Sequence, residues 1–162
     1  MIKNAIDNDR VEKIKKELSN KIGFYRSDKI EKKEVKLDLN NPYATQYNYY
    51  PNDLMNIKSI QEILLDQQLL TLVQKYLNGL PIIDRVNSWY TFPSSSPDDA
   101  AAQYWHFDME RPKWLKVFIF LTDCNIDNGP HEFIKESHKP DGIPLEIRRK
   151  GYQRISEKEI FN

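Results

Sequence analysis

Two residues with metal-ligand chemistry, His106 and Asp108, lie one residue apart in the segment 103–108, whose letters are QYWHFD. We predict a short strand over this segment, and in a strand residues i and i+2 project from the same face. One imidazole and one carboxylate would then point into the same cavity. These are two of the three ligands in the 2-His-1-carboxylate arrangement that holds Fe(II) and leaves other coordination positions open. The motif is short and occurs by chance in many chains, so a surface His–Asp pair is the alternative interpretation.

The elements that must position this pair lie in the second half of the chain, where residues after Pro81 become β-branched and aromatic. Such runs are typical of strands. Residues 114–122 (WLKVFIFLT) are apolar on both faces, as in a strand that is covered on both sides. Besides 103–108, we therefore predict strands over 82–92, 114–122 and 131–136, with a loop at 94–102 and a turn at 123–130.

Helical periodicity dominates the first half of the chain. Apolar residues recur at helical spacing over 11–22 and again over 66–77. Asp66 is a candidate N-cap for the second of these helices, and Gly79 stands where that helix would stop. We expect the apolar stripe of 66–77 to pack against its own domain, and we expect a loop over 38–52.

Two further helix starts are predicted from capping-box spacing, in which a serine precedes a glutamate by three residues. Ser59 and Glu62 have this spacing ahead of the run Ile63-Leu64-Leu65. Ser156 and Glu159 repeat it near the end of the chain, so a helix is expected to begin there.

Composition and charge exclude several classes of protein. The chain has 162 residues, 40% of them apolar and 30% charged, which fits one globular domain. Its formal net charge is zero, which argues against a general binder of nucleic acid or membrane surfaces. Cys124 is the single cysteine, so no internal disulfide can form and a reducing compartment fits. No apolar run suggests a secretory signal or a membrane span, and we expect a cytoplasmic protein.

Residues 101–139, AAQYWHFDMERPKWLKVFIFLTDCNIDNGPHEFIKESHK, combine several features that individually are weak. An aromatic residue precedes H-x-D, a short polar spacer follows, and the next predicted strand ends in Leu-Thr-Asp. An Asn-Gly-Pro turn, another strand and a Ser-His-Lys ending complete the block. Together with upstream helices that contain LLDQQLLTLVQKYLNG, this block resembles the phytanoyl-CoA dioxygenase family of 2-oxoglutarate-dependent oxygenases. The resemblance covers roughly residues 55–160.

The resemblance implies an α+β fold in which N-terminal helices lead into a double-stranded β-helix, a jelly-roll or cupin-like barrel. Residues 1–80 would form the helical part and residues 81–162 the first barrel strands, within one structural domain whose C-terminal strands are missing.

The resemblance also implies a site and its cofactors. His106 and Asp108 match the first two iron ligands of the family, with Fe(II) as the metal, 2-oxoglutarate as cosubstrate and a small molecule as primary substrate. By analogy, Tyr90 and Gln103 are candidates for binding the cosubstrate. For both residues, packing and local hydrogen bonding are equally good interpretations.

The family pattern breaks after this block. It requires a distal histidine on a late strand and an arginine some ten residues further on. The histidines that remain, His131 and His138, lie too early to supply that ligand. We expect the arginines at 148, 149 and 154 to be surface charges. Lys116 could reach into the cavity or extend into solvent, and we expect solvent.

The chain therefore reads as truncated, and three explanations stay open: a fragment, a shortened relative that no longer catalyses, or half of a barrel completed by a second polypeptide. Exposed strand edges would favour self-association or a completing chain. The first functional hypothesis is a dioxygenase fragment that is inactive alone. The alternatives are a non-catalytic scaffold or assembly module and, less well supported, a metal-dependent hydrolase or isomerase on a cupin-like barrel.

Overall fold

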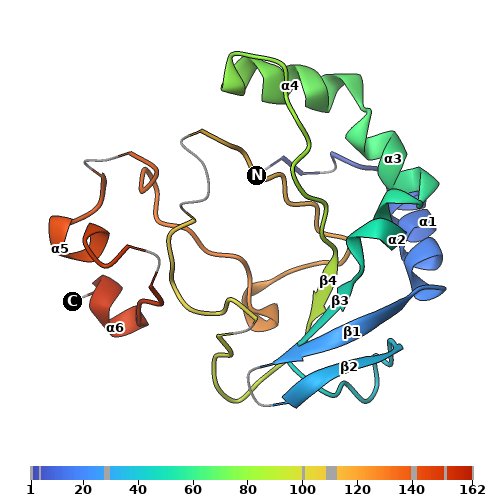
Figure 1. Cartoon of the computed structure of the whole chain (residues 1–162), viewed down its shortest axis with the longest axis horizontal. Helices are drawn as coiled ribbons and strands as arrows, with labels where there is room; N and C mark the ends of the chain where they lie inside the picture. The colour runs from blue at the N-terminus through green and yellow to red at the C-terminus, as the bar shows by residue number, and fades with distance from the viewer. Residues whose placement is uncertain are drawn as a thin grey trace.

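The computed structural model describes residues 2–3, 5–27, 30–99, 101–108, 113–139, 142–151 and 153–161. Within them the chain forms short helices and one four-stranded antiparallel sheet with the strand order β2-β1-β3-β4 (Figure 1). The helices are α1 (Asn8–Ser19), α2 (Pro51–Met55), α3 (Lys58–Leu64), α4 (Gln67–Leu77), the 3-10 turn η1 (Ile126–Asn128), α5 (Leu145–Arg148) and α6 (Glu157–Phe161). The strands are β1 (Ile22–Ser27), β2 (Ile30–Lys36), β3 (Gln46–Tyr49) and β4 (Trp89–Thr91).

The main core lies between one face of the sheet and helices α1, α2 and α3. Tyr25 of β1 and Tyr47 and Tyr49 of β3 are buried on this face. Their rings contact edge to face, with centroids 5.0 Å apart for Tyr25 and Tyr47 and 5.3 Å apart for Tyr47 and Tyr49. The apolar side chains that complete this cluster come from α1, α2, α3 and the α2–α3 junction: Ile14, Leu18, Leu54, Ile57 and Ile63.

The strands approach closely at Gly23, which is why a glycine is needed there. A Cβ at this position would lie 2.2 Å from the backbone oxygen of Asn48 and 2.8 Å from the ring of Tyr47. The same close approach lets the Tyr47 hydroxyl accept a hydrogen bond from the Gly23 backbone N–H at 2.6 Å. That hydroxyl also donates to the Val35 carbonyl at 2.9 Å, so one buried group joins three strands.

The helices predicted from periodicity are confirmed with small changes of boundary, since α1 and α4 fall within or near 11–22 and 66–77. Asp66 caps α4 by accepting a hydrogen bond from the Leu69 backbone N–H at 2.9 Å. At the other end Asn78 takes the left-handed conformation, one residue before Gly79.

The Ser59–Glu62 capping box is wrong. A helix does form there as α3, but its N-cap is Ile57 and no side chain caps it. Ser59 is instead buried inside the helix, where its hydroxyl donates to the carboxylate of Glu17 in α1. A tertiary partner has replaced the local one, and the contact ties α3 to α1.

The expected packing of α4 is also wrong in part. Leu69 packs against the core cluster, yet no residue of α4 is buried, and the large apolar side chains of Leu72 and Tyr76 are exposed. In Figure 1 the helix lies at the top of the molecule, away from the sheet. The apolar stripe thus reaches the core only at its N-terminal end.

Strand prediction was least successful. The hairpin β1–β2 and strand β3 were not predicted, so the part of the chain expected to be helical carries three of the four strands. Of the strand expected over 82–92 only β4 forms. Residues 114–122 form no backbone hydrogen bond within the described part of the chain, and residues 135–138 are turns. A strand requires a hydrogen-bonded neighbour, and β propensity alone does not supply one.

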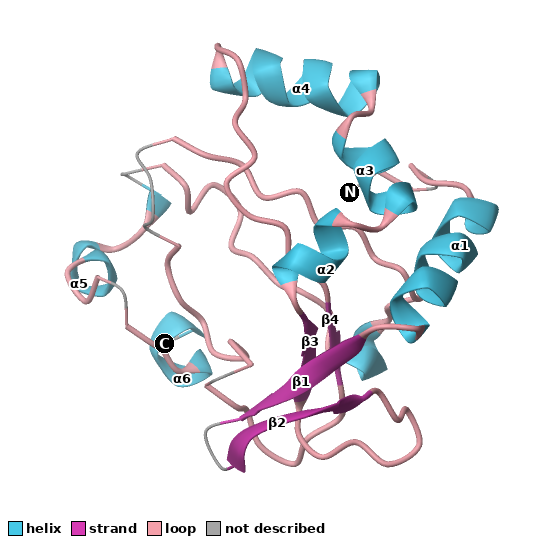
Figure 2. Cartoon of the chain, turned by 45° about the vertical axis from the view of Figure 1, so that its right-hand side comes forward, coloured by secondary structure: helices cyan, strands magenta, loops and turns pink. Residues whose placement is uncertain are grey.

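The segment 103–108 likewise is not a regular strand. Its single β-bridge joins Trp105 to Ile155, and the Ile155 backbone N–H donates to the Trp105 carbonyl at 2.8 Å. The helix expected after Ser156 forms as α6, with half of the predicted capping box: the Ser156 backbone N–H donates to the Glu159 carboxylate at 2.9 Å. The Ser156 hydroxyl donates to the same carboxylate, and the Glu159 N–H bonds to the Ser156 carbonyl at 3.0 Å. Helices α5 and α6 lie apart from the sheet, and long loops join them to it (Figure 2).

The architecture is therefore a mixture of helix and antiparallel sheet, as the α+β prediction requires. The sheet is open, with β2 and β4 at its edges. The spacer at 109–112 and residue 162 lie outside the described residues. No helix of the described ranges combines the length and the apolar character needed to cross a membrane.

Candidate metal centre

His106 and Asp108 lie side by side although their segment is not a regular strand. The His106 Nε2 atom is 3.7 Å from the Asp108 Oδ1 atom, and the two side chains keep 21% and 30% of their surface exposed. The other ring nitrogen, Nδ1, lies 2.7 Å from the Tyr104 carbonyl oxygen. A carbonyl oxygen only accepts, so Nδ1 carries the hydrogen, and in the neutral imidazole Nε2 keeps its lone pair. The backbone thereby fixes the tautomer that a metal needs and turns its free nitrogen toward the carboxylate.

Lys116 contacts this pair directly. Its Nζ atom donates to the Asp108 Oδ2 atom at 2.6 Å, while the lysine side chain remains 41% exposed. The ammonium also lies 4.9 Å from the centre of the Trp114 ring. Lys116 is thus exposed, as expected, but its charged end is held by Asp108 and does not extend freely into solvent. The two oxygens of Asp108 face different partners, His106 and Lys116.

His131 lies within electrostatic reach of the pair. Its ring contacts Phe118, with centroids 4.7 Å apart, and Phe118 in turn meets Trp89 of β4 edge to face at 6.2 Å. The His131 pKa is lowered, chiefly by loss of solvent around part of the ring. The charges of His106 and Lys116 lower it further, while Asp108 opposes them. The ring contacts Trp89–Phe118–His131 thus run from edge strand β4 to a histidine that is electrostatically coupled to His106 and Asp108.

Gln103, a candidate for cosubstrate binding, is engaged by the loop before it. Its side-chain oxygen accepts a hydrogen bond from the Asp98 backbone N–H at 2.8 Å, and its own backbone N–H donates to the Asp98 carbonyl at 3.2 Å. Tyr90, the other candidate, pairs with Tyr47 across β3 and β4 and stacks on Phe92 with centroids 6.3 Å apart. These contacts are those of the packing interpretation, and the proposed role in cosubstrate binding stays a prediction for both residues.

Sequence reasoning missed a buried carboxylate, Asp98, that anchors the loop before the pair. Asp98 is buried, and its Oδ2 atom accepts from the Ser27 hydroxyl at 2.9 Å and from the Thr45 hydroxyl at 3.0 Å. Ser27 ends β1, and Thr45 immediately precedes β3. Asp98 therefore fastens the loop to the sheet. A sequence signal for it is hard to recognise, because Asp98 stands in a polar run, PSSSPDD, typical of exposed loops.

Residues 153–161 contact Trp105, next to His106. Ile155 is buried, and its backbone N–H bonds to Trp105, the residue before His106. The Trp105 ring meets Phe161 of α6 edge to face, with centroids 5.8 Å apart. Arg154, expected to be a surface charge, forms an ion pair with Asp99. The pair is thus placed between two anchors that come from distant parts of the sequence.

The donor set fits part of an iron site. An imidazole nitrogen and a carboxylate oxygen are ligands that Fe(II) accepts. Adjacent ligands with bonds of about 2.1 Å at right angles lie about 3 Å apart. The observed 3.7 Å between Nε2 and Oδ1 needs only a small side-chain rotation. Within the described ranges, however, no group of three His, Cys, Asp or Glu residues is arranged to hold a metal ion. The pair offers two donors of the right type, and the described residues do not show a third.

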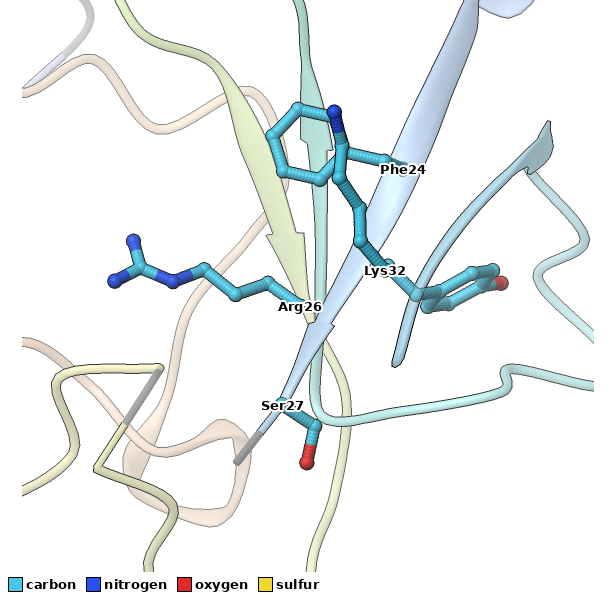
Figure 3. A pocket seen from close by; sticks show the side chains of 5 residues that line it. Phe24, Arg26, Ser27 and Lys32 are labelled. Atoms are coloured by element: carbon cyan, nitrogen blue, oxygen red, sulfur yellow. The ribbon is translucent and has the colours of Figure 1, made fainter. Parts of the chain in front are cut away.

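A separate shallow pocket of about 220 Å³ lies on the β1–β2 hairpin. Figure 3 shows the Lys32 side chain alongside the ring of Phe24, with Arg26 further along β1 pointing away from both. The Lys32 ammonium lies 4.4 Å from the centre of the Phe24 ring and 4.8 Å from that of Tyr50. The pocket is lined by residues of β1 and β2 and does not include the metal-ligand pair.

The class of protein follows from a comparison of the whole sequence with known families. The chain matches the family profile of Phytanoyl-CoA dioxygenase (PhyH) over residues 1–159. The chain belongs to this family, and the match extends the resemblance to the N-terminal residues. No curated protein matches the chain, and no solved structure does.

Proposed function

We propose that His106 and Asp108 are two of the ligands of an Fe(II) centre in a 2-oxoglutarate-dependent oxygenase of the phytanoyl-CoA dioxygenase type. One observation carries this proposal: the free Nε2 of His106 lies 3.7 Å from the carboxylate of Asp108, in a chain that belongs to the family. Family membership supports an oxygenase activity, and the geometry supports these two residues as the metal-binding pair. We propose a small-molecule substrate and a cytoplasmic location.

The residues of the chain would prepare the site and not perform the oxidation. Bound Fe(II) with 2-oxoglutarate would supply the oxidising chemistry. The Tyr104 carbonyl holds His106 in the tautomer whose Nε2 can bind a metal.

For the fold we propose an incomplete jelly-roll barrel in which 114–122 is a strand awaiting its neighbour. Two features of that segment support the proposal. Its backbone forms no hydrogen bond within the described part of the chain, and its apolar side chains at 115 and 117–120 are exposed. Pairing with a further strand, from additional residues or from another chain, would satisfy both the backbone and the apolar surface. Tyr90 and Gln103 are proposed to bind the cosubstrate only in that completed state.

A non-catalytic scaffold is the second candidate function. It is favoured by the two-donor site and by the lysine that already neutralises Asp108. The two functions differ in a measurable way, because a scaffold has no metal affinity that depends on His106. An oxygenase fragment retains weak affinity through His106 and Asp108 but gives no turnover.

The test is an anaerobic titration of the chain with Fe(II) and 2-oxoglutarate, followed by the visible absorption of the iron–keto acid chelate. We expect a weak, saturable signal that is lost in His106→Ala and in Asp108→Ala. His138→Ala is the matched control, because His138 is exposed and has no contact with the pair among the described interactions. Loss of the signal in His138→Ala with retention in His106→Ala would refute the site assignment. Robust formation of succinate by the wild-type chain alone would refute the proposal that the site is incomplete.

A further inference from the structure

The carboxylate of Asp108 carries a cation already, and it comes from the chain itself. Lys116 places its ammonium 2.6 Å from Oδ2, on the carboxylate whose Oδ1 faces His106. Lys116 is the single charged residue of the apolar run 114–122. Its neighbours in the run are exposed apolar side chains. Among the described contacts, Asp108 is the carboxylate that Lys116 binds. The run 114–122 thus places its one positive charge on Asp108, the acidic member of the candidate metal pair.

We propose that Lys116 is a competing cation that occupies the carboxylate of Asp108 until a divalent metal displaces it. This inference rests on the proposed function, because it concerns the same metal pair. Lys116 does not itself bind the metal. It is a positioning residue that sets how readily the site is loaded, and it keeps the isolated carboxylate neutralised when the site holds no metal.

Simple electrostatics gives the direction and the size of the effect. A divalent ion at His106 Nε2 and Asp108 Oδ1 draws on the same carboxylate charge that holds the Lys116 ammonium at Oδ2. The ion also repels that ammonium, so metal binding drives the lysine off the carboxylate. A partly exposed ion pair of this kind is weak, and repulsion between the lysine and the metal adds to its effect in water-like surroundings. Removing the charge should therefore strengthen metal binding about threefold to tenfold.

The first experiment compares Co(II) binding, measured by absorption and calorimetry, in the wild-type chain and in Lys116→Met. Methionine keeps the length and the apolar character of the side chain and removes its charge. The matched control is Lys113→Met, which removes the same charge from a lysine whose Nζ bonds to the Leu77 carbonyl at 3.2 Å. We expect tighter binding in Lys116→Met only, with a difference that shrinks as ionic strength rises, because screening weakens both the ion pair and the repulsion.

A second measurement needs no variant. The wild-type chain is treated with an amine-acetylating reagent, and the rates at Lys116 and Lys113 are compared by peptide mass spectrometry. Displacement by Co(II) frees the Lys116 amine, so its rate should rise relative to Lys113 when the metal is added. An unchanged or reduced rate at Lys116 would overturn the proposal.

The outcomes separate this inference from the proposed function. If Co(II) binds through His106 but no more tightly in Lys116→Met, only the competing-cation inference is overturned. If Co(II) binding in every variant is indifferent to His106→Ala, both the proposed function and this inference are overturned.

Discussion

Replacing Ile155 by alanine tests whether the C-terminal segment is part of the folded core that positions the metal-ligand pair. Ile155 is 1% exposed, and its backbone N–H bonds to Trp105, the residue before His106. Although it lies outside the main cluster under the sheet, it is as deeply buried as the residues there. The substitution keeps the backbone hydrogen bond and removes only apolar contacts.

The expected loss follows from the atoms removed. Isoleucine to alanine deletes three carbon atoms, and at about 0.8 kcal/mol for each buried carbon the transfer term is about 2.4 kcal/mol. The cavity left behind adds to this value, and such substitutions cost about 2–5 kcal/mol in well-packed cores. We therefore expect a loss of about 3 kcal/mol in the free energy of unfolding, a large part of the about 5–15 kcal/mol typical of a domain.

Urea unfolding followed by tryptophan fluorescence measures this loss. The matched control is Ile126→Ala, which makes the same substitution at a side chain that is 83% exposed, and it should change the free energy of unfolding by less than about 0.5 kcal/mol. Co(II) affinity gives a second reading, because a loosened Trp105 should weaken metal binding at His106. Equal stability of Ile155→Ala and Ile126→Ala would refute the view that this segment is packed into the protein.

Three further predictions concern the sheet and the last helix. Tyr47→Phe removes the buried hydroxyl that joins three strands and should cost about 1–3 kcal/mol in urea unfolding, whereas Tyr43→Phe, at an exposed ring, should cost almost nothing. Gly23→Ala would place a Cβ 2.2 Å from a backbone oxygen and should destabilise the chain strongly, while Gly79→Ala meets no atom within 4 Å and should not; a similar midpoint for both would contradict the register of the strands. Hydrogen bonds from a lysine and from the capping serine lower the pKa of Glu159 to about 2 from its usual 4.5. Its stabilising contribution should be present above pH 4.5 and lost as the pH falls toward 2, so Glu159→Gln should flatten the pH dependence of stability in that window, and an unchanged profile would contradict the cap.

Local features were predictable because their causes are local. The helices α1 and α4 follow from apolar residues at helical spacing, and the cap of α4 from an aspartate three residues before the N–H that it binds. The bond from the Ser156 backbone N–H to the Glu159 carboxylate, half of a capping box, is of the same kind. His106 and Asp108 lie side by side because only one residue separates them.

The hairpin β1–β2 was not predicted, because β2 lacks the run of β-branched and aromatic residues that is typical of strands. The letters of β2, IEKKEVK, are mostly charged, and β2 is an edge strand whose side chains can reach solvent. Its place is decided by hydrogen bonds to β1 and by contacts such as the Lys33 ammonium 3.4 Å from the centre of the Tyr43 ring. The run 114–122 shows the reverse case, in which strong β propensity finds no partner within the described part of the chain.

By itself the sequence determined the class of fold, the helices with their caps, the family resemblance and the two residues of the candidate metal pair. Only the tertiary structure decided what surrounds that pair: Lys116 on Asp108, the buried Asp98 beneath the loop, and Ile155 against Trp105. The physical reason is the same in each case. These contacts join segments whose meeting depends on how loops and sheet pack together, and no residue spacing along the chain records where distant side chains will meet.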